Sequence, residues 1–320
     1  MKSRKTQWIY SALAMAAMLA PVSPAGAEDR APASNVPVRM TVTASVASDK
    51  RMPEIRQEDV LVKRGKERLR VTDWALAQGN RAGLDLFILI DDASDPRIGS
   101  QFDELRTFIN AQPQTTSIGI GYMRNTTVQI VQDFTTDHVA AAAALRLPFG
   151  SRAAFGSPYY SVIDLMKRWP EGKNRREVLM VTDGIDRVNR HIGVRRGYSV
   201  NPTVDTATAF AQRTGTMIHT IYFPGVGHLQ RNYWEATNGQ LDMARLSDKT
   251  GGESFYLGLQ SPVSFQPYLS QLQNALNNQY LVSFSAKPGK KAGLQYVELS
   301  TEVAGVEFST HDAVWVPAAK

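Results

Sequence analysis

The sequence predicts an α/β protein with a doubly wound, mainly parallel sheet, flanked by β segments that form a small sandwich-like domain. Two apolar runs, residues 86–90 and 178–181, are typical of strands that are buried on both faces. Between residues 84 and 278, such strands alternate with amphipathic helical patterns, which indicates a parallel sheet covered on both faces. In the flanking segments, 36–83 and 279–317, apolar residues recur with the period of half-buried strands.

The N-terminus predicts a cleaved export signal over residues 1–27. Lys2, Arg4 and Lys5 precede an apolar run at 8–20, and residues 25–27 form a small-residue cleavage motif. The apolar run is too short to span a bilayer comfortably. We therefore expect a periplasmic or secreted protein without stable membrane insertion, which begins with a flexible leader over residues 28–35.

Composition narrows the function classes. The chain has 36 basic and 30 acidic residues, and three of the basic ones precede residue 28, so the mature excess is 33 minus 30, or +3. That excess is too small to argue for nucleic-acid binding. The absence of cysteine excludes disulfides, thiol catalysis and cysteine-based zinc sites.

The N-terminal β segment is predicted to contain a strand at 36–46 and a hairpin formed by 60–62 and 69–71 around Gly65. This hairpin is basic, and both a solvated face and a binding patch are compatible with its charge. Its basic residues are Lys63, Arg64, Lys66, Arg68 and Arg70.

The central segment and the C-terminal segment follow in alternating elements. Helices are expected at about 101–110, 136–145, 158–169, 204–213, 241–249 and 265–278, and strands at 84–90, 118–123, 127–131, 178–182, 217–223 and 253–257. Strands at 280–285 and 297–303 complete the chain. Because the terminal β segments have too few strands to bury an apolar face alone, they are predicted to pack together, with the α/β domain inserted between them.

Carboxylates follow two of the buried strands. Asp91, Asp92 and Asp95 come directly after the first central strand, and Asp183 comes after residues 178–182. In open α/β sheets, ligands bind beyond the carboxyl ends of the strands. The sequence therefore predicts that these carboxylates share one site.

These motifs, together with residues 246–252 (LSDKTGG), resemble those of von Willebrand factor type A domains, and the chain is similar to exported bacterial proteins that carry related domains. The resemblance covers about residues 84–278. It implies a non-enzymatic adhesion or assembly protein that binds a protein partner, often through a metal-ion-dependent adhesion site.

The resemblance implies that Asp91, Asp95, Ser157 and Asp183 would hold Mg²⁺, or alternatively Ca²⁺ or Mn²⁺. The site is degenerate, because Ala93 stands where the family has a serine ligand. An altered metal site and a metal-free binding surface therefore both stay open. Ser157 has a further interpretation as the N-cap of a helix that starts with a proline.

Residues expected to contact the partner lie beside these carboxylates. Asp92 is predicted to face solvent, and a shifted Asp92-x-Ser94 register is a further possibility. The loop after Asp183 is either an anion-attracting rim or a solvated loop. The full set predicted to bind the partner is Asp92, Ser94, Arg187, Arg190, Arg195 and Arg196.

Motifs of the common enzyme classes do not occur in the sequence. It contains no G-x-G-x-x-G after the first strand, no phosphate-binding G-x-x-x-x-G-K, no G-x-S-x-G and no H-E-x-x-H. His219 lies within an apolar strand and is expected to be a core residue. The alternatives to a binding protein are a metal-assisted hydrolase that uses the acidic cluster and a metal-free scaffold protein of the envelope.

Overall fold

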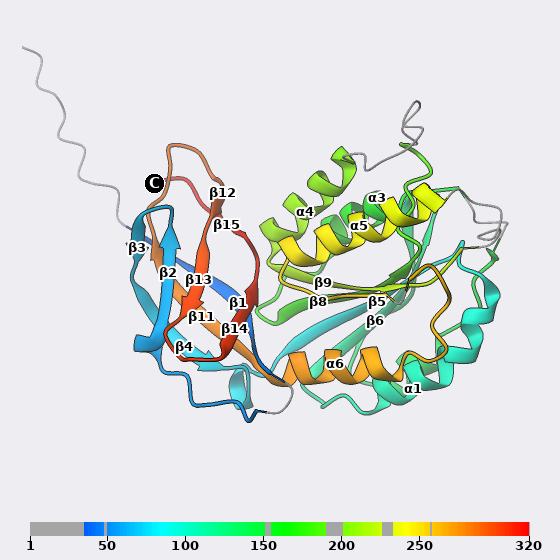
Figure 1. Ribbon diagram of the computed structural model, residues 1–320, viewed down its shortest axis with the longest axis horizontal. Helices are drawn as coiled ribbons and strands as arrows, with labels where there is room; N and C mark the ends of the chain where they lie inside the picture. The colour runs from blue at the N-terminus through cyan, green and yellow to red at the C-terminus, as the bar shows by residue number, and fades with distance from the viewer. Residues whose placement is uncertain are drawn as a thin grey trace, which may run out of the picture. The chain divides into compact units, whose positions relative to one another are not determined.

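The computed structural model describes residues 35–47, 50–150, 155–189, 201–225, 233–256 and 258–319 (Figure 1). The predicted export signal, and the leader up to residue 34, lie outside the described residues. Residues 34–320 form one compact unit. No helix within the described ranges is long and apolar enough to cross a membrane.

A six-stranded sheet forms the centre of the unit. Its order is β10-β9-β8-β5-β6-β7, and only the β6–β7 pair is antiparallel. If the six strands are renumbered 1 to 6 in chain order, the sheet read from β7 has the doubly wound order 3-2-1-4-5-6. The order reverses between β5 and β8. The strands are β5 (Leu84–Asp91), β6 (Thr116–Arg124), β7 (Thr127–Thr135), β8 (Arg175–Thr182), β9 (Thr216–Tyr222) and β10 (Ser254–Phe255). The predicted fold class is confirmed.

Helices cover both faces of this sheet, as Figure 1 shows. The apolar residues of β5 alternate between the two cores: Leu86, Ile88 and Ile90 pack in one, and Phe87 and Leu89 in the other. The first core includes η3 (Pro96–Gln101), α1 (Phe102–Asn110), α2 (His138–Ala143) and α6 (Gln266–Asn277). The second includes α3 (Pro158–Arg168), α4 (Pro202–Thr214) and α5 (Tyr233–Lys249).

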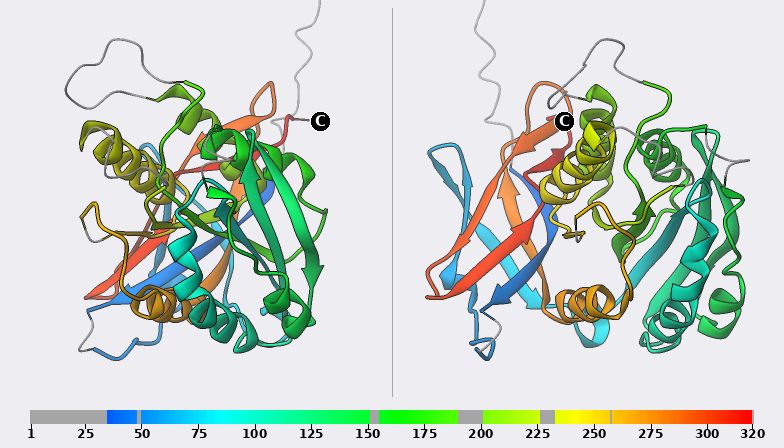
Figure 2. Two further views of the ribbon diagram at one scale, coloured as in Figure 1. Left: turned by 90° about the vertical axis from the view of Figure 1, so that its right-hand side faces the viewer. Right: turned by 45° about the vertical axis from the view of Figure 1, so that its right-hand side comes forward.

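The N-terminal and C-terminal strands form the predicted sandwich around a core of their own. Strand β1 lies between the C-terminal strands β11 and β14, and Figure 2 shows this blue strand among orange and red ones. One sheet has the order β14-β1-β11-β4, a second β13-β2-β3, and β12 pairs with β15. The bounds are β1 (Val36–Val46), β2 (Val60–Arg64), β3 (Glu67–Leu69), β4 (Val71–Leu76), β11 (Gln279–Ala286), β12 (Gly293–Tyr296), β13 (Glu298–Thr301), β14 (Val306–Thr310) and β15 (Ala313–Val316). Two short 3₁₀ helices, η1 (Gln57–Asp59) and η2 (Gly79–Arg81), flank these strands.

A buried polar network joins the sandwich to the six-stranded sheet. The Nε2 atom of His219 lies 2.8 Å from Oε2 of Glu177, and its Nδ1 accepts from the backbone N–H of Glu253 at 3.1 Å. The Gln279 amide donates to Glu177 and accepts from Arg175. His219 is therefore a hydrogen-bonded core residue, as the sequence predicts.

Helix α5 starts earlier than the sequence predicts, at Tyr233 rather than near residue 241. Glycine is a poor helix former, and Gly239 lies within the added turns. In the structure Gly239 is needed within the helix, since a Cβ there would lie 2.4 Å from the carbonyl oxygen of Asp183. Tertiary packing therefore overrides the local preference.

Candidate functional site

Asp91 and Asp183 meet where the strand order reverses, which is the position at which doubly wound sheets bind ligands. Strands β5 and β8 are paired up to Ile90 and Val181, so both carboxylates emerge at the same edge. Oδ2 of Asp91 accepts from the Thr182 hydroxyl at 2.7 Å, and its Oδ1 accepts from the backbone N–H of Ala93 at 2.9 Å.

The positive charge at this point comes from Arg187. Its Nη2 donates to Oδ2 of Asp183 at 2.6 Å, and its Nη1 donates to the carbonyl oxygen of Ile185 at 3.2 Å. Both side chains of the ion pair are almost fully buried. We call Asp91, Asp183 and Arg187 the strand-tip site.

The charges of the strand-tip site are strongly coupled. Burial raises the pKa of Asp91. The charge of Arg187 lowers this pKa, and the neighbouring carboxylate of Asp183 raises it further. Although burial disfavours its charge, Asp183 and Asp91 together raise the pKa of Arg187. The guanidinium therefore stays charged and offsets part of the negative charge of the two strand-tip carboxylates.

Asp92 does not face solvent, and that prediction is wrong. Its side chain is 0% exposed, and its oxygens accept from Arg146 Nη1 at 2.7 Å and Nη2 at 3.0 Å. The Arg146 guanidinium lies 3.8 Å from the ring centroid of Tyr122 and 4.3 Å from that of Phe149. Asp92 thus anchors the segment after α2 onto the sheet edge and is not available for a partner.

The side chain of Asp95 interacts with Arg97, two residues further along the chain. Asp95 is the N-cap of η3, where its side chain accepts from the backbone N–H of Arg97 at 3.0 Å and pairs with the Arg97 guanidinium at 2.9 Å. The hydrogen bonds and charge of Arg97 lower the pKa of Asp95. Ser94 is buried and forms a β-bridge with Gly225, so it does not offer a surface contact either.

Ser157 is the N-cap of α3, with Pro158 in the first turn, as one of the two interpretations predicts. Its hydroxyl accepts from the backbone N–H of Tyr160 at 3.4 Å. The same side chain lines a small cavity together with Asp91 and Arg187. Ser157 thus lies at the strand-tip site, although its visible role is to cap a helix.

The sequence predicts a turn at Arg124-Asn125 between the strands at 118–123 and 127–131, but it does not predict that this turn forms one wall of the cavity. Arg124 pairs with Thr127 across the turn, and Asn125 and Thr126 have φ values of 50° and 67°. Positive φ at both central positions is typical of a type I′ hairpin turn, where glycine is preferred and a β-branched residue is strained. The dipeptide Asn125-Thr126 gives only a partial signal for such a turn.

Replacing Thr126 by glycine is expected to raise the free energy of unfolding by about 1 kcal/mol, because the left-handed conformation costs glycine little. Chemical denaturation measures this change. A Thr127→Gly variant, at a residue with no positive φ, serves as the control and should be destabilised. Equal destabilisation by both substitutions would contradict the strained turn.

The backbone of Gly225 lies against the buried ion pair of the strand-tip site and leaves no room for a side chain. A Cβ at this position would lie 2.7 Å from Oδ2 of Asp183 and 3.1 Å from Nη2 of Arg187. The backbone also comes close here because Asp95 donates its N–H to the carbonyl oxygen of Pro224 at 3.1 Å. Only glycine leaves room for the buried ion pair.

The donor set does not fit a divalent cation. Arg187 occupies the neighbourhood of the two strand-tip carboxylates, Ala93 supplies no ligand, and Asp95 is bound to Arg97. Among the described residues, no group of three or more Asp, Glu or His is arranged to hold a metal ion. A guanidinium in this place would repel a cation.

The remaining predicted partner residues fall in two groups. Arg187 points inward, so it is a residue of the site and not of its rim. Arg190, Arg195 and Arg196 lie outside the described residues.

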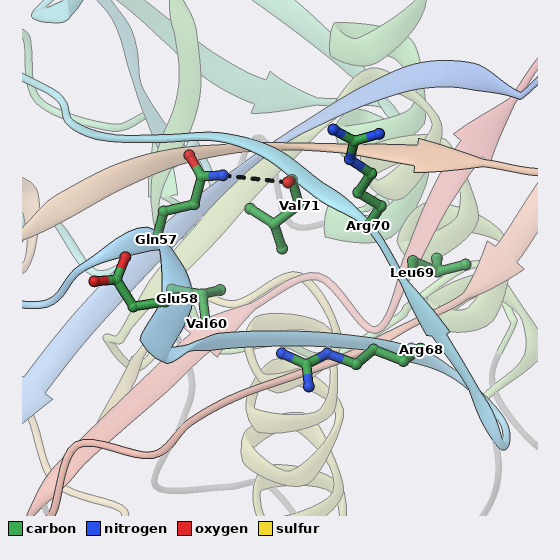
Figure 3. Close-up of a pocket in the computed structure, with 7 residues that line it drawn as sticks. All are labelled: Gln57, Glu58, Val60, Arg68, Leu69, Arg70 and Val71. Atoms are coloured by element: carbon green, nitrogen blue, oxygen red, sulfur yellow. Dashed lines mark hydrogen bonds between the residues drawn. The ribbon is translucent and has the colours of Figure 1, made fainter.

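The basic hairpin also carries a pocket, of about 710 Å³, in the sandwich (Figure 3). Gln57 closes one side by donating to the carbonyl oxygen of Val71 at 3.3 Å. In Figure 3, the side chains of Arg68 and Arg70 point in different directions. Because the two guanidinium groups diverge, the solvated interpretation of the hairpin fits this arrangement better than a binding patch.

Comparison with known proteins gives the fold alone. No protein-family model matches the chain, and no curated protein matches it. It is similar in structure to an aerotolerance-related membrane protein from Bacteroides fragilis, with 11% identity, a TM-score of 0.41 and coverage of 61% of this chain and 99% of the other. BatB from Bacteroides thetaiotaomicron has 12% identity and a TM-score of 0.38, and the match covers 61% of this chain and 98% of the other. The SpRpn10 VWA domain has 13% identity and a TM-score of 0.37, and the match covers 59% of this chain and 94% of the other. The sheet order of the chain itself is the doubly wound order predicted from the sequence, with aspartates at two adjacent strand tips.

Proposed function

We propose that this chain is an exported, non-enzymatic binding protein that holds a protein partner at the carboxyl-end edge of its six-stranded sheet without a divalent cation. The observation that carries the proposal is the buried ion pair between Arg187 and Asp183, with 2.6 Å between Nη2 and Oδ2. The arginine brings the positive charge that a metal ion would supply beside these carboxylates. The expected adhesion site is thus replaced by an internal salt bridge.

Exposed apolar side chains surround this edge. Phe155 is 64% exposed and lines the small cavity, and Phe149 is 45% exposed. Arg124 links them, because it lines the same cavity and its guanidinium lies 4.9 Å from the centroid of the Phe149 ring. Aromatic and arginine side chains are enriched at protein interfaces, and clustered exposed apolar groups mark interaction sites.

The buried residues would act by positioning this surface. Arg187 donates its backbone N–H to the carbonyl oxygen of Gly156 at 2.9 Å, beside Phe155. Asp92 accepts from the backbone N–H of Phe149 at 3.1 Å. The backbone at Phe149 and next to Phe155 is therefore tied to the strand tips, and rigid placement lowers the entropic cost of binding. Arg190, Arg195 and Arg196 remain a predicted rim for acidic groups of the partner.

The first test concerns the cation. The melting temperature of the wild-type protein is expected to be the same in chelator and in millimolar Mg²⁺, Ca²⁺ or Mn²⁺, because a ligand that does not bind the folded state cannot stabilise it. Thermal melts followed by circular dichroism measure this. A melting temperature that rises with cation concentration would show that a metal site exists despite Arg187.

The second test concerns the surface. A Phe149→Ser/Phe155→Ser variant is expected to lose the proteins that cross-link to the wild type in envelope extracts, with or without chelator, since its apolar anchors are removed. A Val139→Ser/Tyr296→Ser variant, changed at two residues 74% and 73% exposed, is the matched control and should retain them. Equal capture by both variants would place the interface elsewhere. Turnover of a phosphate ester that disappears in Asp91→Ala would instead favour the hydrolase alternative.

A further inference from the structure

A second concave surface lies at the amino ends of the strands, opposite the strand-tip site. It is a groove of about 590 Å³ between the sandwich and the α/β part. Residues 38–41 of β1 and 313–315 of β15 form one wall, and residues 171–176 and 212–215 form the other. Helix α4 contacts β15 directly, so the two walls belong to one packed structure.

The groove is strongly cationic. Its lining includes a single acidic residue, Glu171, against five basic residues. The five are Arg39, Lys173, Arg175, Arg176 and Arg213. Within the described part of the chain, none of them forms an ion pair with a carboxylate. Glu171 and Asp85 act on Arg176, and Glu177 acts on Arg175, but the basic residues still outnumber these carboxylates. A bound anion would relieve the remaining repulsion.

Arg175 gives independent support for a ligand. Its side chain is buried, and its Nη atoms donate to Gln279, Leu276 and Ala82. Its Nε atom is also buried but has no hydrogen-bond partner. Burial lowers the pKa of Arg175, and the charge of Arg39 lowers it further, whereas Glu177 opposes both. This buried guanidinium therefore adds a fixed positive charge to the wall of the groove, and an acidic ligand would offset that charge.

The lining also provides an apolar and aromatic surface. The guanidinium of Arg213 lies 4.5 Å from the centroid of the half-buried Trp315 ring, which fixes both side chains. Met40 and Val314 line the groove beside this pair. Inorganic phosphate would use the charges but not this apolar wall, whereas a peptide with acidic and apolar side chains would use both.

We propose that this junction groove, defined by Arg39, Arg175, Arg213 and Trp315, binds an acidic peptide segment of a partner protein. Carboxylates of the segment pair with Arg39 and Arg213 at the entrance, and an apolar side chain packs on Trp315. The groove is independent of the strand-tip site, so the chain would offer two binding surfaces at opposite ends of its sheet.

Isothermal titration calorimetry with a short synthetic peptide of alternating glutamate and leucine tests the proposal on the full chain. An Arg39→Ser/Arg213→Ser variant is expected to bind it at least about tenfold more weakly, because two charge-assisted contacts to the glutamates are lost. A Lys63→Ser/Lys66→Ser variant removes the same charge from exposed residues of the β2–β3 hairpin and should bind like the wild type. All four residues are exposed, so both variants should retain the melting temperature of the wild type.

Two further probes separate the ligand classes. A glutamine–leucine peptide should not bind, and a glutamate–serine peptide should bind more weakly than the glutamate–leucine peptide. Equal weakening in both double variants would overturn the groove as the site. If inorganic phosphate competes as well as the peptide, the groove is a general anion site and the peptide assignment is overturned. The strand-tip site is tested separately, so a negative result for the groove would not affect those tests.

Discussion

Replacing Arg187 by alanine is expected to lower the free energy of unfolding by about 3–5 kcal/mol. The substitution removes the guanidinium that lies beside the buried carboxylates of Asp183 and Asp91, and breaking a buried ion pair by removing one partner has an effect of this size. Chemical denaturation of the wild type and the variant measures the loss.

The same variant is expected to become sensitive to divalent cations. Without the Arg187 guanidinium, the carboxylate oxygens of Asp91 and Asp183 and the Ser157 hydroxyl form a set of hard oxygen donors that suits Mg²⁺ or Mn²⁺. Binding to the folded state alone then raises the melting temperature in proportion to the logarithm of cation concentration. The wild type, in which Arg187 stays in place, should not respond.

The matched control is Arg97→Ala. Arg97 also pairs with an aspartate at this edge of the sheet, at 2.9 Å from Asp95, but its side chain is 73% exposed. Its loss should change stability by no more than about 1 kcal/mol, as for other exposed ion pairs. If Arg187→Ala were as mild as Arg97→Ala and gained no response to Mn²⁺, the strand-tip site would not depend on an internal cation.

Two buried groups are expected to give opposite pH dependences of stability. Burial lowers the pKa of His311 to about 4, with Thr216 and Glu177 opposing the shift. Burial raises the pKa of Asp242 to about 7; its hydrogen bond to Asn201 and the charge of Arg245 act against the shift, and nearby Asp186 and Asp205 add to it. In the unfolded chain these groups titrate near 6.5 and 3.8.

The signs follow from which state binds the proton. Between pH 6.5 and 4 the unfolded chain protonates His311 and the folded protein does not, so acidification removes about 3 kcal/mol of stability. Between pH 7 and 3.8 the folded protein protonates Asp242 and the unfolded chain does not, so acidification adds about 4 kcal/mol. In the wild type the two contributions largely cancel.

Single substitutions separate the contributions of His311 and Asp242 to the pH dependence of stability. From pH 7 to pH 4, an Asp242→Asn variant should lose about 3 kcal/mol relative to the wild type, and a His311→Gln variant should gain a similar amount. Denaturant titrations at several pH values measure these slopes, and Asp103→Asn, at an exposed aspartate, is the control. Parallel curves for the wild type and both variants would mean that neither group titrates as its burial requires.

Local patterns in the sequence predicted the central sheet well. Continuous apolar runs identified β5 and β8, and alternation identified β1 and β11, because burial on two faces or on one leaves a direct trace in the order of residues. The Ser157 cap was also visible, since a cap and the first turn it completes are adjacent in the chain. Residues 233–240 were missed as helix because the close approach of Gly239 to the 183–184 turn is a long-range contact.

The sequence by itself determined that Asp91 and Asp183 stand at neighbouring strand tips, because strand ends follow from hydrophobic runs and parallel strands align their carboxyl ends. Only the tertiary structure decided what neutralises them. Arg187 is four residues from Asp183, yet its side chain turns inward only because Gly225 leaves room for the ion pair. Asp92 is buried because Arg146, 54 residues away, reaches it. Periodicity records whether a position is covered, whereas the pairing of buried charges depends on which residues the fold brings together.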